Sequence, residues 1–183
     1  MKKMVIIWMM SLSLISCNLN NNLKKEITEF YATSIELAVD SLFRYTYNFH
    51  DSLLFDNNYK TLVVYHDSMT CGVCESRKLH SWQTLLSSID SLNNHYPFNV
   101  LFIFTPQQDQ TTSLKVMLKN VEMDYPIIID EKHLFSSQNK HIPQNPLLHT
   151  FLLNEDKKVI LVGDILYNTN VRKLFLDQIG KKE

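Results

Sequence analysis

The chain has 183 residues, of which 45% are hydrophobic and 20% are charged, and this is an ordinary composition for one globular domain with a proper core. Its formal net charge at pH 7 is −1, from 18 lysines and arginines against 19 aspartates and glutamates. The sequence has no basic cluster and no loop that interleaves aromatic residues with lysines, which argues against nucleic acid as a partner.

The first segment, MKKMVIIWMMSLSLISC, is organised like an export signal. Lys2 and Lys3 form a positive region, and the apolar stretch 4–15 that follows is too short to span a bilayer as a helix. Its end, Leu-Ile-Ser-Cys, resembles the lipobox of bacterial lipoproteins, in which a signal peptidase cuts before the cysteine and a diacylglyceryl group is attached to the sulfur. We therefore predict a signal peptide over 1–16, a lipidated Cys17 and a flexible tether over 17–22. An ordinary signal peptide with a chance cysteine is the alternative.

Residues 23–59 are expected to form an N-terminal extension that covers the fold. The apolar residues of 23–37 recur at helical spacing, but 34–39 also reads as a strand, and the sequence does not separate the two. The segment 42–49 is rich in aromatic residues, and 51–55 is another short apolar piece before a turn at Asn57 and Asn58. Strands that contribute aromatic side chains to the core are the favoured interpretation of these two pieces.

A strand, a loop and a helix are predicted over 61–92. The β-branched apolar run 61–66 indicates the strand, and Cys71 and Cys74 follow after a short polar loop. Apolar positions then recur three or four apart: Leu79, Trp82, Leu85, Leu86, Ile89 and Leu92. The two cysteines therefore fall in the first turn of the helix, where free N–H groups and the macrodipole stabilise a thiolate. A reversible disulfide is the chemistry that this spacing favours.

A cysteine pair at this spacing can also belong to a zinc site or act as an inert staple. Zinc needs two more ligands, but no second pair and no His-x3-His follows, and the seven histidines are scattered along the chain. Three cysteines in an exported protein would leave one unpaired, whereas lipidation of Cys17 leaves the pair Cys71 and Cys74. Redox chemistry is therefore the favoured interpretation, and no metal and no cofactor is predicted.

The rest of the chain continues the alternation of strands and helices. The nearly continuous apolar run 98–104 suits a central strand that is buried on both faces. A helix is predicted over 109–123, with Asp109, Thr111 and Thr112 as caps. A short strand, 127–129, and a short helix over 130–139 that packs through Leu134 and Phe135 come next.

The C-terminal part is predicted to be a hairpin followed by a helix. The segments 149–153 and 158–162 are expected to pair antiparallel across the turn 154–157. The terminal helix is expected to start at Asn168 and to pack through four apolar residues: Val171, Leu174, Phe175 and Ile179.

This order, with CGVC at the start of the first long helix and a hairpin and helix at the end, resembles the thioredoxin fold. The extra strand and helix in YPIIIDEKHLF, followed by HTFLLNEDKKV, are similar to the redoxin branch, which includes peroxiredoxins and membrane-anchored thiol-disulfide reductases, and most of all to exported Bacteroidetes-type lipoproteins. The resemblance covers about 61–179. It implies an α/β thioredoxin-like domain over 60–183, with a central mixed sheet flanked by helices and a strand-helix insertion.

Two positions depart from the thioredoxin pattern. Thioredoxins read WCGPC, whereas Thr70 stands here at the tryptophan position and Val73 at the proline position. His149 falls where the family has a cis-proline, and because cis bonds before other residues are costly, a trans bond is expected. In the family fold this position faces the two sulfurs, so His149 could hold a proton, contact substrate or join both cysteines as a metal ligand. The simpler interpretation is that His149 is a histidine at the strand end without a functional role.

The resemblance implies a lipid-anchored thiol-disulfide oxidoreductase of the bacterial cell envelope. Cys71, nearer the helix start and exposed, is expected to attack, and Cys74 to resolve the mixed disulfide from the protein interior. His66, Asp67 and Glu75 are candidates for proton transfer, although each is more simply a solvated loop residue. The expected partners are protein thiols and disulfides and an unidentified membrane or periplasmic electron donor.

The residue after the lipidated cysteine indicates which membrane holds the anchor. Asn18, after the lipidated cysteine, is not the aspartate that retains lipoproteins in the inner membrane of enteric bacteria, and this favours the outer membrane.

Two other functions stay open. A thiol peroxidase would oxidise Cys71 to a sulfenic acid that Cys74 resolves, but the peroxiredoxin pattern PxxxTxxC is half met, with Ser68 at the threonine and Val64 at the proline. A binding module is the other possibility: a copper or zinc carrier that uses the two cysteines and His149, or an adaptor without redox activity.

Overall fold

The structure is a computed structural model that describes residues 21–37, 46–47, 55–92 and 97–180. The predicted signal peptide, Cys17, most of the aromatic segment 42–49 and all but the last residue of the apolar piece 51–55 lie outside these residues. Within the described ranges, none of the helices combines the length and the hydrophobicity needed to cross a membrane.

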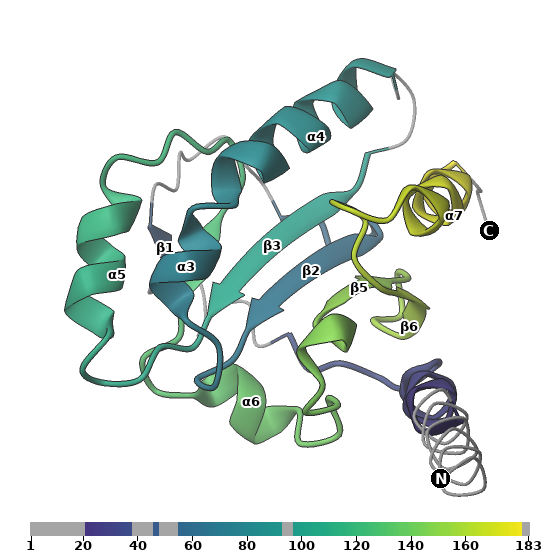
Figure 1. Ribbon diagram of the computed structural model, residues 1–183. Helices are drawn as coiled ribbons and strands as arrows, with labels where there is room; N and C mark the ends of the chain where they lie inside the picture. Colours follow the sequence, from purple (N-terminus) through teal and green to yellow (C-terminus); the bar gives the residue numbers. More distant parts are fainter. Residues whose placement is uncertain (1–20, 38–45, 48–54, 93–96, 181–183) are drawn as a thin grey trace, which may run out of the picture.

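A six-stranded mixed sheet forms the centre of the molecule, in the order β1-β4-β3-β2-β5-β6 (Figure 1). Strands β2, β3 and β4 run parallel, whereas β5 is antiparallel to β2, β6 to β5 and β1 to β4. The strands are β1 (Thr46–Tyr47), β2 (Thr61–His66), β3 (Asn99–Phe104), β4 (Ile127–Ile129), β5 (Thr150–Leu153) and β6 (Val159–Val162). The predicted mixed sheet and the predicted hairpin of β5 and β6 are confirmed.

The two central strands are buried on both faces, as the apolar run 98–104 predicted. All six residues of β3 and the first five of β2 are buried. The two strands pair in register from Thr61 opposite Asn99 to His66 opposite Phe104, so both end at the same edge of the sheet. In a parallel pair this carboxyl edge is where the loops that follow the strands gather.

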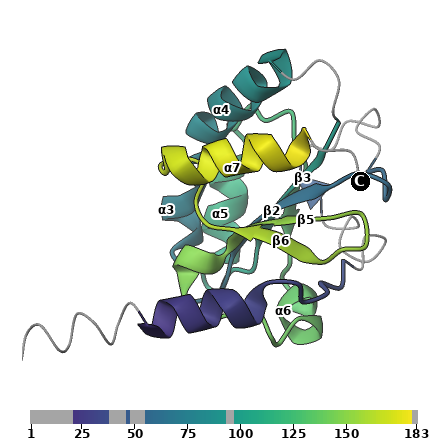
Figure 2. The same cartoon turned by 90° about the vertical axis from the view of Figure 1, so that its right-hand side faces the viewer.

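Helices cover both faces of the sheet (Figures 1 and 2). One core cluster joins the sheet to α4, α5 and α7, and the other joins it to α6 and to the N-terminal helix at 21–30. The helices are α3 (Gly72–Ser76), α4 (Leu79–Leu92), α5 (Thr111–Leu118), α6 (Leu134–Gln138), α7 (Thr169–Ile179) and the 3₁₀ helix η2 (Pro146–Leu148).

The single helix expected after the cysteines is divided into α3 and α4. The Lys78 N–H donates to the Glu75 carbonyl at 2.9 Å, an i to i+3 bond that tightens the chain, and the Trp82 N–H then starts the next α-helical turn on Lys78. Trp82 and three more of the predicted apolar positions are buried: Leu79, Leu86 and Ile89. The break falls at Arg77 and Lys78, which are good helix formers, so the sequence contains no signal for it.

The helix predicted over 109–123 is shorter than expected, and its predicted caps are wrong. It covers Thr111–Leu118, with Gln110 at the N-cap and no side-chain cap bond. The Thr111 hydroxyl donates instead to the Gln107 carbonyl at 3.2 Å. The chain turns at 119–120, and Met123 reaches the core from the irregular segment that follows. In the sequence, Met123 falls at helical spacing although it lies beyond the helix.

Asp130 holds the start of α6. Its side chain is completely buried, and its two carboxylate oxygens accept the N–H groups of Leu134 and Phe135, each at 2.9 Å. Phe135 is fully buried, as expected, and Leu134 is only partly buried.

The N-terminal segment combines the two structures that the sequence left open. A helix occupies 21–30, so the last two residues of the predicted tether are helical. Ala32 then takes a positive φ of 63°, and Ser34 forms an isolated antiparallel bridge with Lys158, the residue just before β6.

The terminal helix begins at Thr169, one residue after the predicted start, and Asn168 is its N-cap, because that side chain accepts the N–H groups of Asn170 and Val171. Phe175 and Ile179 are buried, but Leu174 is 52% exposed, so its predicted role in packing is wrong. The spacing of the apolar residues predicts a wider buried face on this helix than the sheet and α4 cover in the structure.

Candidate redox site at the carboxyl ends of β2 and β3

A tight turn after β2 places the cysteines at the edge of the sheet. One carboxylate oxygen of Asp67 accepts the N–H groups of Met69 and Thr70, both at 3.0 Å. The Thr70 hydroxyl donates to the Asp67 carbonyl at 2.8 Å. Asp67 and Thr70 therefore build the turn that leads to Cys71.

Cys71 and Cys74 are joined by a disulfide in the first turn of α3, as predicted. Cys71 is the N-cap residue, and its Sγ accepts the Cys74 N–H at 3.2 Å. The predicted interior position of Cys74 is wrong, since both cysteines are exposed. The buried positions of α3 are Gly72 and Ser76, four residues apart, so position 74 faces solvent.

His66, the last residue of β2, is packed away from water. Its ring lies on Phe104 with 4.5 Å between the ring centroids, and its side chain is 12% exposed. Burial lowers the pKa of His66 to about 3, and the positive charge of Lys78 adds to this effect. His66 Nδ1 is 3.8 Å from a carboxylate oxygen of Glu75, but a neutral ring at this distance makes no ion pair.

Because its folded-state pKa is lowered, His66 should make stability depend on pH. Below pH 6.5 the His66 ring binds a proton in the unfolded chain but stays neutral in the folded chain. The free energy of unfolding therefore falls as the pH drops from 6.5 toward 3. Between pH 6.5 and pH 5, we expect the free energy of unfolding to fall by about 1.5 kcal/mol less in His66→Phe than in the wild type. Urea unfolding at several pH values would measure it.

His80→Gln is the matched control, because His80 is exposed on α4. Parallel pH profiles for wild type and His66→Phe would show that His66 titrates in the folded protein as it does in the unfolded chain.

A small cavity of about 180 Å³ brings together the accessory residues that the sequence suggested. Its lining includes Thr70, Glu75, His149 and His66. The two carboxylate oxygens of Glu75 each lie 2.9 Å from the ammonium group of Lys78, and this hydrogen bond raises the pKa of Lys78. Whether any of these residues transfers a proton stays a prediction.

The lining of this cavity also includes polar residues that the sequence did not suggest for the site, among them Lys78, Asp164 and Tyr167. Lys78 lies three positions after Glu75 on the same face of the chain, a spacing that could have indicated the pair. Asp164 and Tyr167 come from the loop after β6, and only the tertiary structure brings this loop to the site.

His149 follows η2 and has a trans peptide bond, as expected, since the described residues contain no cis bond. Its side chain is 3% exposed, and Nε2 lies 2.8 Å from the Pro143 carbonyl. A carbonyl oxygen only accepts, so this bond requires a hydrogen on Nε2, and in the neutral ring Nδ1 then carries the lone pair. Nδ1 is buried and has no hydrogen-bond partner among the described residues.

The alternative metal site, made of Cys71, Cys74 and His149, is not formed in the structure. Among the residues that the structure describes, no group of three or more His, Cys, Asp and Glu side chains is placed to hold a metal ion. His149 is turned to the Pro143 carbonyl and packs beside Tyr65, with 5.0 Å between the ring centroids.

The strand order and the place of the disulfide decide the fold. Parallel strands β2 and β3 are connected through the helices that begin at the disulfide, and the antiparallel pair β5 and β6 lies on the other side of β2, followed by α7. The fold is thioredoxin-like. In this fold, β4 and α6 form the strand-helix insertion that the segment 125–135 predicted.

Comparisons with solved structures return proteins of this fold at low identity. StoA from Bacillus subtilis is 21% identical with a TM-score of 0.42, over 59% of this chain and 76% of StoA. Peroxiredoxin Q from Xanthomonas campestris is 11% identical with a TM-score of 0.42, over 67% and 78%. A yeast mitochondrial 1-Cys peroxiredoxin is 16% identical with a TM-score of 0.39, over 67% and 65%. No family model matches the chain, and neither does any curated protein.

Proposed function

We propose that the protein is a thiol-disulfide oxidoreductase that exchanges disulfides through Cys71 and Cys74. The observation that carries this proposal is the exposed Cys71–Cys74 disulfide at the carboxyl edge of the central strands, with the Cys74 N–H directed at Cys71 Sγ. An N–H donor stabilises a thiolate more than a thiol, so it favours Cys71 as the attacking sulfur in the reduced protein.

Exposed apolar side chains near the disulfide support a protein as the partner. Met69 is 88% exposed, Leu147 66% and Tyr167 64%, and the three come from the turn after β2, from η2 and from the loop after β6. Leu147 and Tyr167 line the same cavity as Thr70, the neighbour of both Met69 and Cys71. Exposed apolar side chains surrounded by polar residues are typical of surfaces that bind other proteins. We infer that protein disulfides dock over these three side chains.

Titration of the thiols at defined redox poise would test the proposal. We expect one transition in which Cys71 and Cys74 change together, with the two-electron dependence of about 30 mV per tenfold change in the ratio of reduced to oxidised protein. A disulfide that remains oxidised at every poise, or reduced protein that fails to reduce insulin, would identify the pair as an inert staple. The metal content of the purified reduced protein would test the carrier alternative directly.

We also propose that the protein is a lipoprotein of the cell envelope, anchored through Cys17 and held in the outer membrane. This part lies outside the described residues. Lipidation is supported by the basic start, the short apolar stretch and Leu-Ile-Ser before the cysteine. The outer membrane is supported by Asn18, which stands where an aspartate would retain the protein in the inner membrane.

Cys17→Ala should prevent lipidation and release the protein from membranes or leave its precursor uncut. Membrane fractionation, with mass spectrometry of the mature N-terminus, would measure this. Cys71→Ala serves as the control, since it also removes one cysteine but should leave the anchor intact. An unmodified Cys17 in the membrane-bound wild type would refute the lipid anchor.

A further inference from the structure

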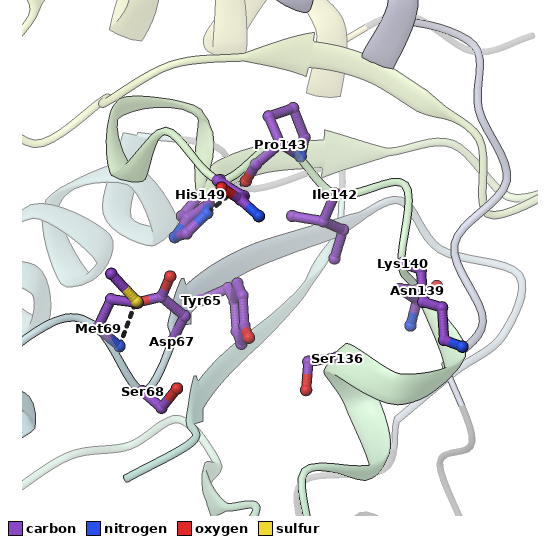
Figure 3. Close-up of a pocket in the computed structure, with 11 residues that line it drawn as sticks. Tyr65, Asp67, Ser68, Met69, Ser136, Asn139, Lys140, Ile142, Pro143 and His149 are labelled. Atoms are coloured by element: carbon purple, nitrogen blue, oxygen red, sulfur yellow. Dashed lines mark hydrogen bonds between the residues drawn. The ribbon is translucent and has the colours of Figure 1, made fainter. Parts of the chain in front are cut away.

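A second cavity, of about 340 Å³, lies beside the disulfide loop on the face of the sheet that α6 covers (Figure 3). The turn after β2, the end of α6 and the segment before η2 line it, and it shares Tyr65 and His149 with the smaller cavity. A volume of this size suits a small molecule rather than a protein segment. Of the three side chains proposed to contact a protein partner, only Met69 lines this cavity, and its interior has no role in the functions proposed above.

Two opposite charges stand at separate sides of the cavity. Figure 3 shows Asp67 and Met69 on one side and Lys140 with Asn139 on the other, with Tyr65 between them. Asp67 uses one carboxylate oxygen for the turn, and its second oxygen accepts no hydrogen bond from a described residue. The ammonium group of Lys140 forms no ion pair with the described part of the chain.

Neutral polar groups complete the lining. The hydroxyl-bearing side chains of Ser68 and Ser136 and the amide of Gln144 line the cavity together with Tyr65. His149 lines it as well, and its side chain is 97% buried with Nδ1 unpartnered among the described residues. A buried acceptor without a donor is costly unless a ligand supplies the donor.

We propose that this cavity binds one half of a small disulfide that carries an ammonium and a carboxylate group, an amino-acid-type disulfide. The carboxylate pairs with Lys140 and the ammonium with Asp67, whereas a ligand with one charge would leave the opposite group of the cavity uncompensated. Met69 lines the cavity and is two positions before Cys71, so the cavity adjoins the loop that leads to the redox site. The proposal requires the ligand sulfur to extend from the cavity toward Cys71. This proposal rests on the proposed oxidoreductase function and names a small-molecule substrate for it.

The reaction balances with the protein dithiol as the reductant. The Cys71 thiolate attacks one sulfur of the ligand disulfide, forms a mixed disulfide and expels the other half as a thiolate, which takes up a proton from water. The Cys74 thiol loses its proton, attacks Cys71 Sγ and expels the second half as a thiol. Two electrons pass from the protein to the ligand, and the Cys71–Cys74 disulfide is restored.

Binding can be tested without any redox step. S-methylglutathione carries both charges and cannot exchange, so calorimetry with the oxidised full-length protein reports occupancy alone. We expect Lys140→Gln and Asp67→Asn each to weaken binding about tenfold, because each removes one charge-assisted contact. Asn at position 67 keeps an oxygen for the two N–H groups of the turn. Lys173→Gln, at an exposed position on α7, should leave the affinity within twofold.

Single-turnover kinetics separate this proposal from the general function. Pre-reduced protein would be mixed with oxidised glutathione, which carries both charges, or with hydroxyethyl disulfide, which carries none. We expect the ratio of the two rates to fall about tenfold in Lys140→Gln and to stay within twofold in Lys173→Gln. An unchanged ratio in Lys140→Gln, or no binding of S-methylglutathione to the wild type, would overturn the cavity assignment. Failure to reduce either disulfide would overturn the oxidoreductase function itself.

Discussion

Cys71→Ser should abolish disulfide exchange, with a loss of at least about a thousandfold in the rate of insulin reduction. A serine hydroxyl is not ionised at neutral pH and forms no mixed disulfide, so the reaction loses its nucleophile. Cys74→Ser should behave differently, because Cys71 can still attack but the mixed disulfide is not resolved. It should accumulate a covalent complex with substrate after one turnover.

The contrast between the two variants is informative because both cysteines are exposed, and exposure therefore does not assign the attacking sulfur. The assignment rests on the N–H of Cys74, which donates to Cys71 Sγ at 3.2 Å. Mass spectrometry of each variant after mixing with a disulfide substrate would show which one forms the covalent complex. A stable complex with Cys71→Ser, and none with Cys74→Ser, would reverse the roles of the two cysteines.

Phe104→Ala should lower the free energy of unfolding by about 3–5 kcal/mol, which is typical for removing a fully buried aromatic ring. Phe104 is 1% exposed at the end of β3. Its ring packs on the His66 ring, and it lies close to Gly72, where an added Cβ would be 3.8 Å from Phe104 Cδ1. The substitution therefore leaves a cavity directly beneath the redox helix.

Urea unfolding of the oxidised protein would measure this loss. Val116→Ala is the control, because Val116 is 55% exposed on α5 and should cost less than about 0.5 kcal/mol. A loss below about 1 kcal/mol for Phe104→Ala would mean that the end of β3 is not packed against α3 as described. Water can enter the new cavity, so we expect the pKa of His66 to rise in this variant as its burial decreases.

The sequence by itself determined the core strands, the disulfide and the order of elements. The runs 61–66 and 98–104 are apolar throughout because both of their faces are buried, and this signal is local. The spacing of Cys71 and Cys74 ahead of a helical pattern likewise depends on neighbours within a few turns. The resemblance of HTFLLNEDKKV to a known strand singles out His149 in the sequence, and the energy of the peptide bond predicts its trans bond.

The tertiary structure alone decided which side chains face solvent and which residues meet. Cys74 is exposed because α5 packs over Gly72 on the other side of α3, a contact between residues about forty positions apart. Asp67 and Lys140 line one cavity because α6 and the turn after β2 end at the same edge of the sheet. Such contacts arise between elements far apart in the chain, and periodicity within one element contains no information about them.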